Sequence, residues 1–257
     1  MTIARVLIVA GSDSGGGAGI QADIKTVTML GGYAMTAVTA ITAQNTLGVQ
    51  AVHSVPPEMV VAQMRSVIDD IGVDAVKIGM IGSAKTAHAV ADVLERLDAP
   101  VVFDPVMVAT SGSVLTDGET VAAFRRLMAW ATVITPNLPE LAALGGLDAL
   151  LADGRTVLVK GGHAESDLIV DRLVAPDGEI ARWSNPRIVT RHAHGTGCTL
   201  ASGVAVGLAQ GMTLTASTAR AIAYVRAALA AAPGLGGGHG PMGHALGRSP
   251  YEALCPA

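Results

Sequence analysis

One stretch of the sequence decides the fold: Val6-Leu7-Ile8-Val9-Ala10-Gly11-Ser12-Asp13-Ser14-Gly15-Gly16-Gly17-Ala18-Gly19. It starts with an unbroken apolar run, which is typical of a strand that is buried on both faces. A glycine-rich turn follows at once, and apolar residues then recur at near-helical spacing over residues 20–30, until Gly31-Gly32. The stretch therefore predicts a buried strand, a tight turn and a helix, which is the repeating unit of α/β folds.

The same alternation continues along the chain. Apolar runs predict strands over residues 35–41, 49–55, 75–78, 101–103, 132–134 and 156–159, and amphipathic stretches predict helices over residues 57–71, 85–97, 120–129, 198–210 and 214–231. A brief helix is expected after residue 137, and residues 167–190 are expected to form antiparallel strands around Pro176-Asp177-Gly178. Together these elements predict a mostly parallel central sheet with helices on both faces, and a single domain over residues 1–257.

Composition argues against several classes of protein. The 257 residues carry a formal net charge of -4 without a basic run, so neither nucleic acid nor an anionic membrane is expected as the main partner. No apolar run reaches the ~20 residues that a membrane-spanning helix needs. Cys198 and Cys255 lack the spacing of a disulfide framework, which favours a reducing, cytoplasmic location.

Polar or glycine-rich residues follow one predicted strand after another. Ligands bind at the carboxyl ends of the strands in doubly wound sheets, so these residues predict a ligand-binding rim. They are Gly11-Ser12-Asp13, Gln44-Asn45, Gly79-Met80, Asp104-Pro105, Asn137 and Lys160-Gly161-Gly162. The first glycine-rich turn is compatible both with backbone contacts to a ligand and with a simple tight turn.

The strongest site candidate is His194-Gly195-Thr196-Gly197-Cys198-Thr199, which opens an apolar helix. Glycines at a helix start present several backbone amides toward one point, and this forms an anion pocket. Cys198 is expected in the first helical turn, where the helix dipole would lower the pKa of its thiol from the ~8.5 reference. Such a thiolate would accept a proton from a substrate hydroxyl, whereas the alternative is a small buried cysteine under a tight turn.

Further candidates carry two readings each. Asn137 and Glu140 have the spacing of a helix capping box, and they also suit Mg²⁺ held through water. Asp104 is either a metal or phosphate site residue or an ordinary strand terminator, and Lys160, at the end of an apolar strand, suits phosphate. Gln44 suits the amide-like edge of a ring or is a plain loop residue, and Met80 suits an aromatic ring or core packing.

The motifs, taken together and in order, resemble the ribokinase-like superfamily and, within it, the bacterial hydroxymethylpyrimidine/phosphomethylpyrimidine kinases of thiamin biosynthesis. The resemblance spans nearly the whole chain, and the ordered set is far more specific than any one string. The matching strings are AGSDSGGGAGIQADIKT (10–26), TAITAQNT (39–46), KIGM (77–80), DPVM (104–107), ITPNLPE (134–140), VKGGH (159–163) and HGTGCTL (194–200).

The resemblance implies a ribokinase-like three-layer α/β/α fold, ATP with Mg²⁺, and a cytoplasmic homodimer. It implies two successive phosphorylations, first of 4-amino-5-hydroxymethyl-2-methylpyrimidine and then of its monophosphate. Carried over by position, Gln44 would hydrogen-bond the pyrimidine, and Gly11, Ala18, Met80 and Val106 would line the ring pocket. Gly195, Thr196 and Gly197 would form the anion hole, with Cys198 as catalytic base. Asp104, Asn137 and Lys160 would serve the ATP phosphates, and Glu140 would hold Mg²⁺ through water.

The sequence departs from the family pattern in two places. The segment of residues 141–156 is shorter than usual, which would remove a peripheral helix, and His192-Ala193 stands where Asn-Thr is expected. Cysteine at position 198, where many sugar kinases have aspartate, indicates the vitamin-kinase branch. Pyridoxal kinase is the alternative enzyme, and a catalytically silent pyrimidine-binding protein is the alternative outside enzymes. A dinucleotide-dependent oxidoreductase is disfavoured, because Gly15, Gly17 and Gly19 have the wrong spacing for its fingerprint.

Overall fold

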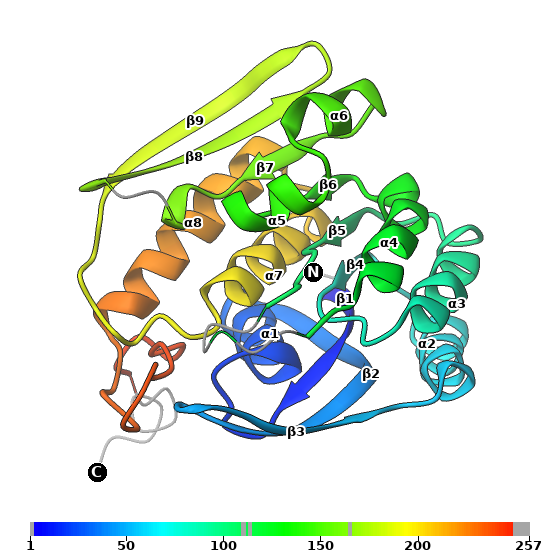
Figure 1. Ribbon diagram of the computed structural model, residues 1–257, viewed down its shortest axis with the longest axis horizontal. Helices are drawn as coiled ribbons and strands as arrows, with labels where there is room; N and C mark the ends of the chain where they lie inside the picture. The colour runs from blue at the N-terminus through cyan, green and yellow to red at the C-terminus, as the bar shows by residue number, and fades with distance from the viewer. Residues whose placement is uncertain (1–2, 109–111, 113–114, 164–165, 249–257) are drawn as a thin grey trace.

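The computed structural model describes residues 3–108, 112, 115–163 and 166–248. They form one mixed sheet whose strands lie in the order β3-β2-β1-β4-β5-β6-β7-β8-β9 (Figure 1). The six strands from β2 to β7 are parallel, and β3, β8 and β9 are antiparallel to their neighbours. The bounds are β1 Ala4–Asp13, β2 Gly32–Asn45, β3 Gly48–Ser54, β4 Ala75–Ile78, β5 Val101–Phe103, β6 Val133–Ile134, β7 Val157–Val159, β8 Leu168–Ala175 and β9 Gly178–Pro186.

Helices cover both faces of this sheet (Figure 1). One face packs against α2 (Pro57–Asp70), α3 (Ala84–Leu94) and α4 (Gly118–Trp130), and the other packs against α1 (Gly19–Met29), α7 (Thr196–Ala209) and α8 (Leu214–Ala230). The three-layer α/β/α fold with a mostly parallel centre, predicted from the sequence, is therefore confirmed.

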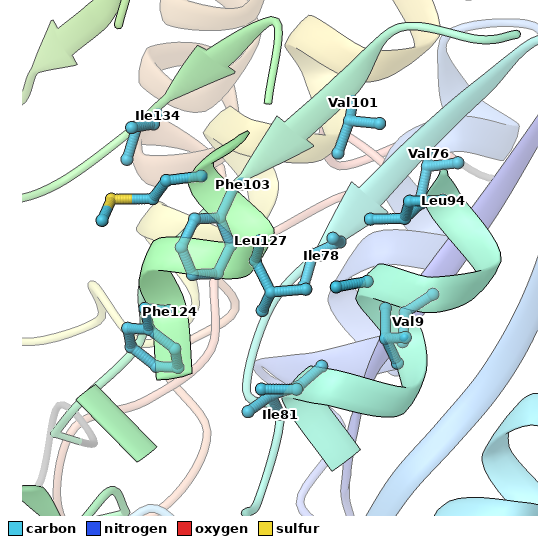
Figure 2. Close-up of a cluster of buried hydrophobic side chains, with 14 of the residues drawn as sticks. Val9, Val76, Ile78, Ile81, Leu94, Val101, Phe103, Phe124, Leu127 and Ile134 are labelled. Atoms are coloured by element: carbon cyan, nitrogen blue, oxygen red, sulfur yellow. The ribbon is translucent and has the colours of Figure 1, made fainter. Parts of the chain in front are cut away.

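The apolar strands divide their side chains between the two faces. Val101 and Phe103 of β5 point into the core under α3 and α4, while Val102 between them packs toward α7. In the first core, shown in Figure 2, Phe103 meets Phe124 of α4 edge to face with ring centroids 5.1 Å apart. Burial on both faces explains why these strands carry continuous apolar runs instead of an alternating pattern.

The structure extends or divides several predicted elements. Strand β2 is longer than the predicted 35–41, so that Gln44 lies on the strand itself and not in a loop. The short segment before β7 holds two small helices, α5 (Leu138–Ala143) and α6 (Leu147–Ala152), where one was expected. Gly145 and Gly146 join them with φ of 97° and 90°, backbone angles that residues with a Cβ rarely adopt. The shortened segment therefore still covers the edge of the core, through the buried Leu150.

Within the described part of the chain, the helices are all too short or too polar to span a bilayer.

Candidate active site

A cavity of about 760 Å³ lies at the carboxyl ends of the parallel strands. Every site residue that the sequence predicted lines it: Gly11, Ala18, Gln44, Met80, Asp104, Val106, Asn137, Glu140, Lys160, Gly195, Thr196, Gly197 and Cys198. The residues come from strands and turns far apart in the sequence. Parallel strands bring them together because their carboxyl ends meet at one edge of the sheet.

The turn before α7 is built for close backbone approach. Gly195 caps the helix in the left-handed region with φ of 85°, and a Cβ there would overlap the carbonyl oxygen of Gly17. The first hydrogen bond of the helix runs from Thr199 N–H to Gly195 O at 2.9 Å. The N–H groups of Gly197 and Cys198 come before it, so they have no partner within the helix. This geometry fits the predicted anion pocket.

Cys198 lies in the first turn of α7 with its half-buried side chain on the cavity wall. Burial raises the pKa of its thiol to about 11, against the opposing charge of Lys77. The sequence-based prediction of a lowered pKa was therefore wrong, because it considered the helix dipole and not the loss of water around the sulfur. The group is a thiol at neutral pH, and its thiolate is a minor form that becomes more abundant as the pH rises.

A cation flanked by two carboxylates forms the floor beside this turn. Lys160 Nζ lies 2.7 Å from Asp104 Oδ1 and 3.8 Å from Glu140 Oε2. Burial alone would lower the pKa of Lys160, but Asp104 and then Glu140 outweigh it and hold the pKa above its usual value. Thr135 donates a further hydrogen bond to Asp104. An added Cβ on Gly197 would lie 3.4 Å from Lys160 Nζ, so the charged pair lies directly beneath the turn that begins α7.

The predicted capping box is present, and it also lines the cavity. The Asn137 side chain accepts from the Glu140 N–H, and the Glu140 carboxylate accepts from the Asn137 N–H, both at 2.8 Å. Burial raises the pKa of Glu140, against the opposing effect of Lys160. The structural and functional readings of these two residues are therefore compatible, since the box fixes the carboxylate at the cavity edge.

The first glycine-rich turn wraps around its own aspartate. Asp13 accepts hydrogen bonds from the N–H groups of Gly15, Gly17 and Ala18 at 2.8–3.0 Å. Burial would raise the pKa of Asp13, but a hydrogen bond from His194 and those from the backbone outweigh burial and hold the pKa below its usual range. These amides therefore serve an internal carboxylate, although Gly11 and Ala18 still line the cavity.

His194 connects this turn to the end of the cavity where Gln44 lies. Its Nε2 lies 3.0 Å from Asp13 Oδ2 and 3.3 Å from the side-chain amide of Gln44. The hydroxyl of Thr42 donates to the oxygen of the same amide, Gln44 Oε1, at 3.2 Å. A Cβ on Gly17 would collide with the imidazole, so glycine at this position lets the ring pack against the turn.

The glycine-rich tail, residues 234–240, hydrogen-bonds two segments that neighbour the cavity. The N–H of His239 donates to the Thr46 carbonyl at 2.8 Å, and the N–H of His194 donates to the Gly240 carbonyl at 3.2 Å. The tail thus ties the turn after Gln44 to the turn before Cys198. Backbone contacts between segments so far apart in the chain leave no periodic signal in the sequence.

A second buried ion pair lies under Cys198. Lys77 on β4 is fully buried and pairs with the buried Asp23 of α1 at 2.8 Å, while Ser202 of α7 donates to Asp23 at 2.7 Å. Ser202 is one helical turn beyond Cys198. Burial would lower the pKa of Lys77, but Asp23 and then Cys198 hold it above its usual value. The Lys77 ammonium thus stays charged beneath the end of the cavity where Cys198 lies.

Reading the sequence missed the roles of Asp13, Asp23, Lys77 and His194, although all four lie within the matched strings. A lysine inside a buried apolar strand does carry a signal, because a charge there requires a partner. The identity of that partner on α1 is a property of packing and is not visible in the sequence.

The donor set at the cavity floor suits a hard cation held together with phosphates. Among the residues described, no three His, Cys, Asp or Glu side chains gather into a metal-binding group. Mg²⁺ is usually held by one or two carboxylates with water and substrate phosphates, and Asp104 and Glu140 offer two carboxylates beside the anion-binding turn. The residues therefore fit Mg²⁺ bound with a nucleotide.

Known proteins resemble this chain over most of its length. A hydroxymethylpyrimidine/phosphomethylpyrimidine kinase of Streptomyces coelicolor is 50% identical, with 93% of each chain covered. Among solved structures, a Staphylococcus aureus pyridoxal kinase in complex with AMP-PCP and pyridoxal matches with a TM-score of 0.85 and 30% identity, covering 95% of this chain and 94% of that one. A phosphomethylpyrimidine kinase of Clostridium difficile matches with a TM-score of 0.75 and 35% identity, covering 88% and 98%. Residues 13–243 match the family described as phosphomethylpyrimidine kinase, and the chain belongs to that family.

Proposed function

We propose that this protein is an ATP-dependent kinase that phosphorylates 4-amino-5-hydroxymethyl-2-methylpyrimidine and then converts the monophosphate to the pyrophosphate, for thiamin biosynthesis. The observation that carries the proposal is the cavity at the carboxyl ends of the parallel strands. It joins Gln44 at one end to an anion-binding turn, Cys198 and the Lys160–Asp104 pair at the other. Membership of the phosphomethylpyrimidine kinase family supports the same assignment.

The ring-binding end places the hydroxymethyl group for reaction. Gln44 hydrogen-bonds the ring edge, and Gly11, Ala18, Met80 and Val106 enclose the ring. The hydroxymethyl oxygen then attacks the γ-phosphorus of ATP, its proton passes to the thiolate form of Cys198, and the bond from the γ-phosphorus to the bridging oxygen of ADP breaks. The N–H groups of the Gly195-Thr196-Gly197 turn stabilise the negative charge on the transferred group.

The phosphate-binding end neutralises charge. Lys160 stays protonated and faces the phosphates from beneath Gly197, and Asn137 and Asp104 position them. Asp104 and Glu140 would hold Mg²⁺, with Glu140 acting through water. When bound, Mg²⁺ screens the negative charge between the nucleotide phosphates.

Turnover on defined alcohols tests the proposal. Purified protein with Mg-ATP is given the hydroxymethylpyrimidine, its monophosphate or pyridoxal, and ADP release is followed while products are identified by mass spectrometry. We expect both pyrimidines to be phosphorylated with a higher kcat/KM than pyridoxal. A clear preference for pyridoxal would reassign the enzyme. Tight pyrimidine binding without ADP release would make the chain a silent binding protein.

We also propose that the protein is a cytoplasmic homodimer whose subunit is one kinase domain over residues 1–257. The edge strand β3, its neighbour β2 and the turn between them support the dimer, because they expose the apolar side chains of Tyr33, Ile41, Leu47 and Val52. Light scattering should give twice the 25.9 kDa of one chain, and a monomer at micromolar concentration would contradict the dimer.

The continuous sheet supports a single domain, for which unfolding in one cooperative transition is expected. Cell fractionation should find the protein with cytoplasmic markers.

A further inference from the structure

We propose that the glycine-rich tail is a positioning element, which holds the ring-binding end of the cavity in its binding geometry by fastening the turn after Gln44 to the turn before α7. The inference rests on the proposed function, in which Gln44 contacts the pyrimidine. Among the residues that the structure describes, those of the tail do not line the cavity. The tail therefore acts on a ligand indirectly, through the two turns that it joins.

The middle of the tail hydrogen-bonds the turn between β2 and β3. The N–H of His239 donates to the Thr46 carbonyl at 2.8 Å, and the N–H of Gly238 donates to the Thr46 hydroxyl at 3.3 Å. Figure 1 shows the chain after α8 reaching the tip of this hairpin. Thr46 follows Gln44 by two residues, directly after β2, so these bonds hold the strand end that carries Gln44.

The last residue of the tail holds the turn before α7. The N–H of His194 donates to the Gly240 carbonyl at 3.2 Å, and His194 forms an isolated bridge with Pro241. The imidazole of the same residue lies 3.3 Å from the side-chain amide of Gln44. The two turns are therefore joined twice, once by these side chains and once by the tail. A displaced tail would let the turns separate and weaken the contact between Gln44 and His194.

The chain beyond the tail is anchored to α7 and α8. The N–H of Gly243 donates to the Ala228 carbonyl at 2.9 Å, and the hydroxyl of Tyr224 donates to the His244 carbonyl at 2.8 Å. The buried His244 imidazole lies 3.0 Å from the hydroxyl of Thr199, in the first turn of α7. Since α8 precedes the tail and this anchor follows it, both ends of the tail are fixed. A strain within the tail is therefore passed to the two turns.

Packing leaves no room for a side chain at two positions of the tail. A Cβ on Gly238 would overlap the Thr46 carbonyl, and a Cβ on Gly240 would lie 2.6 Å from another carbonyl oxygen of the tail. At Gly237 the nearest atom would be Leu47 Cδ2 at 3.8 Å, which is an ordinary contact. These three glycines are not among those with a positive φ, so an added methyl group acts through the space it fills. Neighbouring positions of one segment thus supply both the test and its control.

The test adds one methyl group at a time. Calorimetry gives the Kd of the hydroxymethylpyrimidine and of Mg-ATP, and ADP release gives each KM, for wild type, Gly238→Ala, Gly240→Ala and the control Gly237→Ala. We expect the first two variants to raise Kd and KM for the pyrimidine by ~10–10²-fold, because a displacement of about 1 Å in a positioning group has effects of this size. The Kd of Mg-ATP should hardly change, since Asp104 and Lys160 lie at the ends of other strands. Gly237→Ala should behave as the wild type does.

Hydrogen exchange supplies a second measurement that needs no variant. Coupling between two sites is reciprocal, so a tail that favours ring binding must itself be stabilised by the bound ring. We expect the hydroxymethylpyrimidine to slow amide exchange in the tail of the wild type, and Mg-ATP alone to leave that exchange unchanged. This measurement decides the question if Gly238→Ala and Gly240→Ala do not fold, as judged by their thermal melts.

The outcomes separate this inference from the proposed function. Pyrimidine Kd and KM values in Gly238→Ala and Gly240→Ala equal to those of Gly237→Ala would overturn the inference and leave the kinase intact. Equal losses for the pyrimidine and for Mg-ATP would also overturn it, because that pattern indicates general destabilisation. If the wild type binds the pyrimidine without releasing ADP, the proposed function fails, and the Kd comparison still decides the inference. If the wild type prefers pyridoxal, the same comparison is made with pyridoxal as the ring.

Discussion

Replacing Cys198 with alanine is expected to lower kcat on the hydroxymethylpyrimidine by ~10²–10⁴-fold, the usual contribution of a positioned general base. The Kd for the pyrimidine should hardly change, because Gln44, the proposed ring contact, lies at the other end of the cavity. Cys198→Ser keeps a similar shape but replaces the thiol by a far less acidic hydroxyl, so it should lose nearly as much. The measurement is ADP release under single-turnover conditions, with calorimetry for binding.

The pH dependence follows from the burial of the sulfur. Because burial raises the thiol pKa to about 11, the thiolate is scarce at neutral pH and becomes tenfold more abundant per pH unit below that value. We expect log kcat of wild type to rise with pH through the mildly alkaline range, and the Cys198→Ala profile to be flat. Alkylation of Cys198 by iodoacetamide should rise in parallel, and Cys255→Ala serves as the control that leaves one cysteine to label.

The contrary outcome is simple to recognise. If Cys198→Ala retains wild-type kcat within the error of the assay, the sulfur is not the base, and the anion-binding turn with Lys160 carries the reaction by charge neutralisation alone. The kinase assignment would stand in that case, since it depends on the cavity and on ADP release from the wild type.

The sequence predicted the layers of the fold and the residues that line the cavity. It did not predict the protonation state of those residues. Continuous apolar runs such as residues 6–10 specify buried parallel strands, and strand ends specify where polar residues meet, so Gln44 and Lys160 were expected at one edge before their geometry was known. The thiol pKa of Cys198 depends on how much water the fold leaves around it, and no local pattern records that.

The hydrogen-bond partners of the charged side chains could not be predicted from the sequence either. Asp13 precedes a glycine-rich turn, for which the sequence left open both backbone contact with a ligand and a simple tight turn. The fold gives the amides of Gly15, Gly17 and Ala18 to Asp13 itself. His194 lies 181 residues from Asp13 in sequence, and their contact arises because the two turns pack glycine against glycine. Such contacts follow from tertiary packing, and they determine the electrostatics on which the proposed function rests.

Replacing Lys77 with methionine is expected to have the largest effect on stability, about 3–5 kcal/mol of unfolding free energy, because it leaves the Asp23 carboxylate buried without its counterion. Both side chains are fully buried, and Nζ lies 2.9 and 2.8 Å from the two carboxylate oxygens. Among the residues that the structure describes, the Ser202 hydroxyl is the one side-chain hydrogen-bond donor that Asp23 would keep. Urea unfolding followed by circular dichroism measures the loss.

Two matched variants separate the charge effect from simple truncation. Arg126→Ala breaks the exposed pair between Arg126 and Asp92, and it should cost less than about 1 kcal/mol because water already screens that pair. The double variant Lys77→Met/Asp23→Leu removes both buried charges, and it should recover most of the stability that Lys77→Met loses. A Lys77→Met protein no less stable than Arg126→Ala would show that Asp23 takes up a proton or finds water at little cost. The pair would then matter for the charge beneath Cys198 and not for holding α1 and α7 on the sheet.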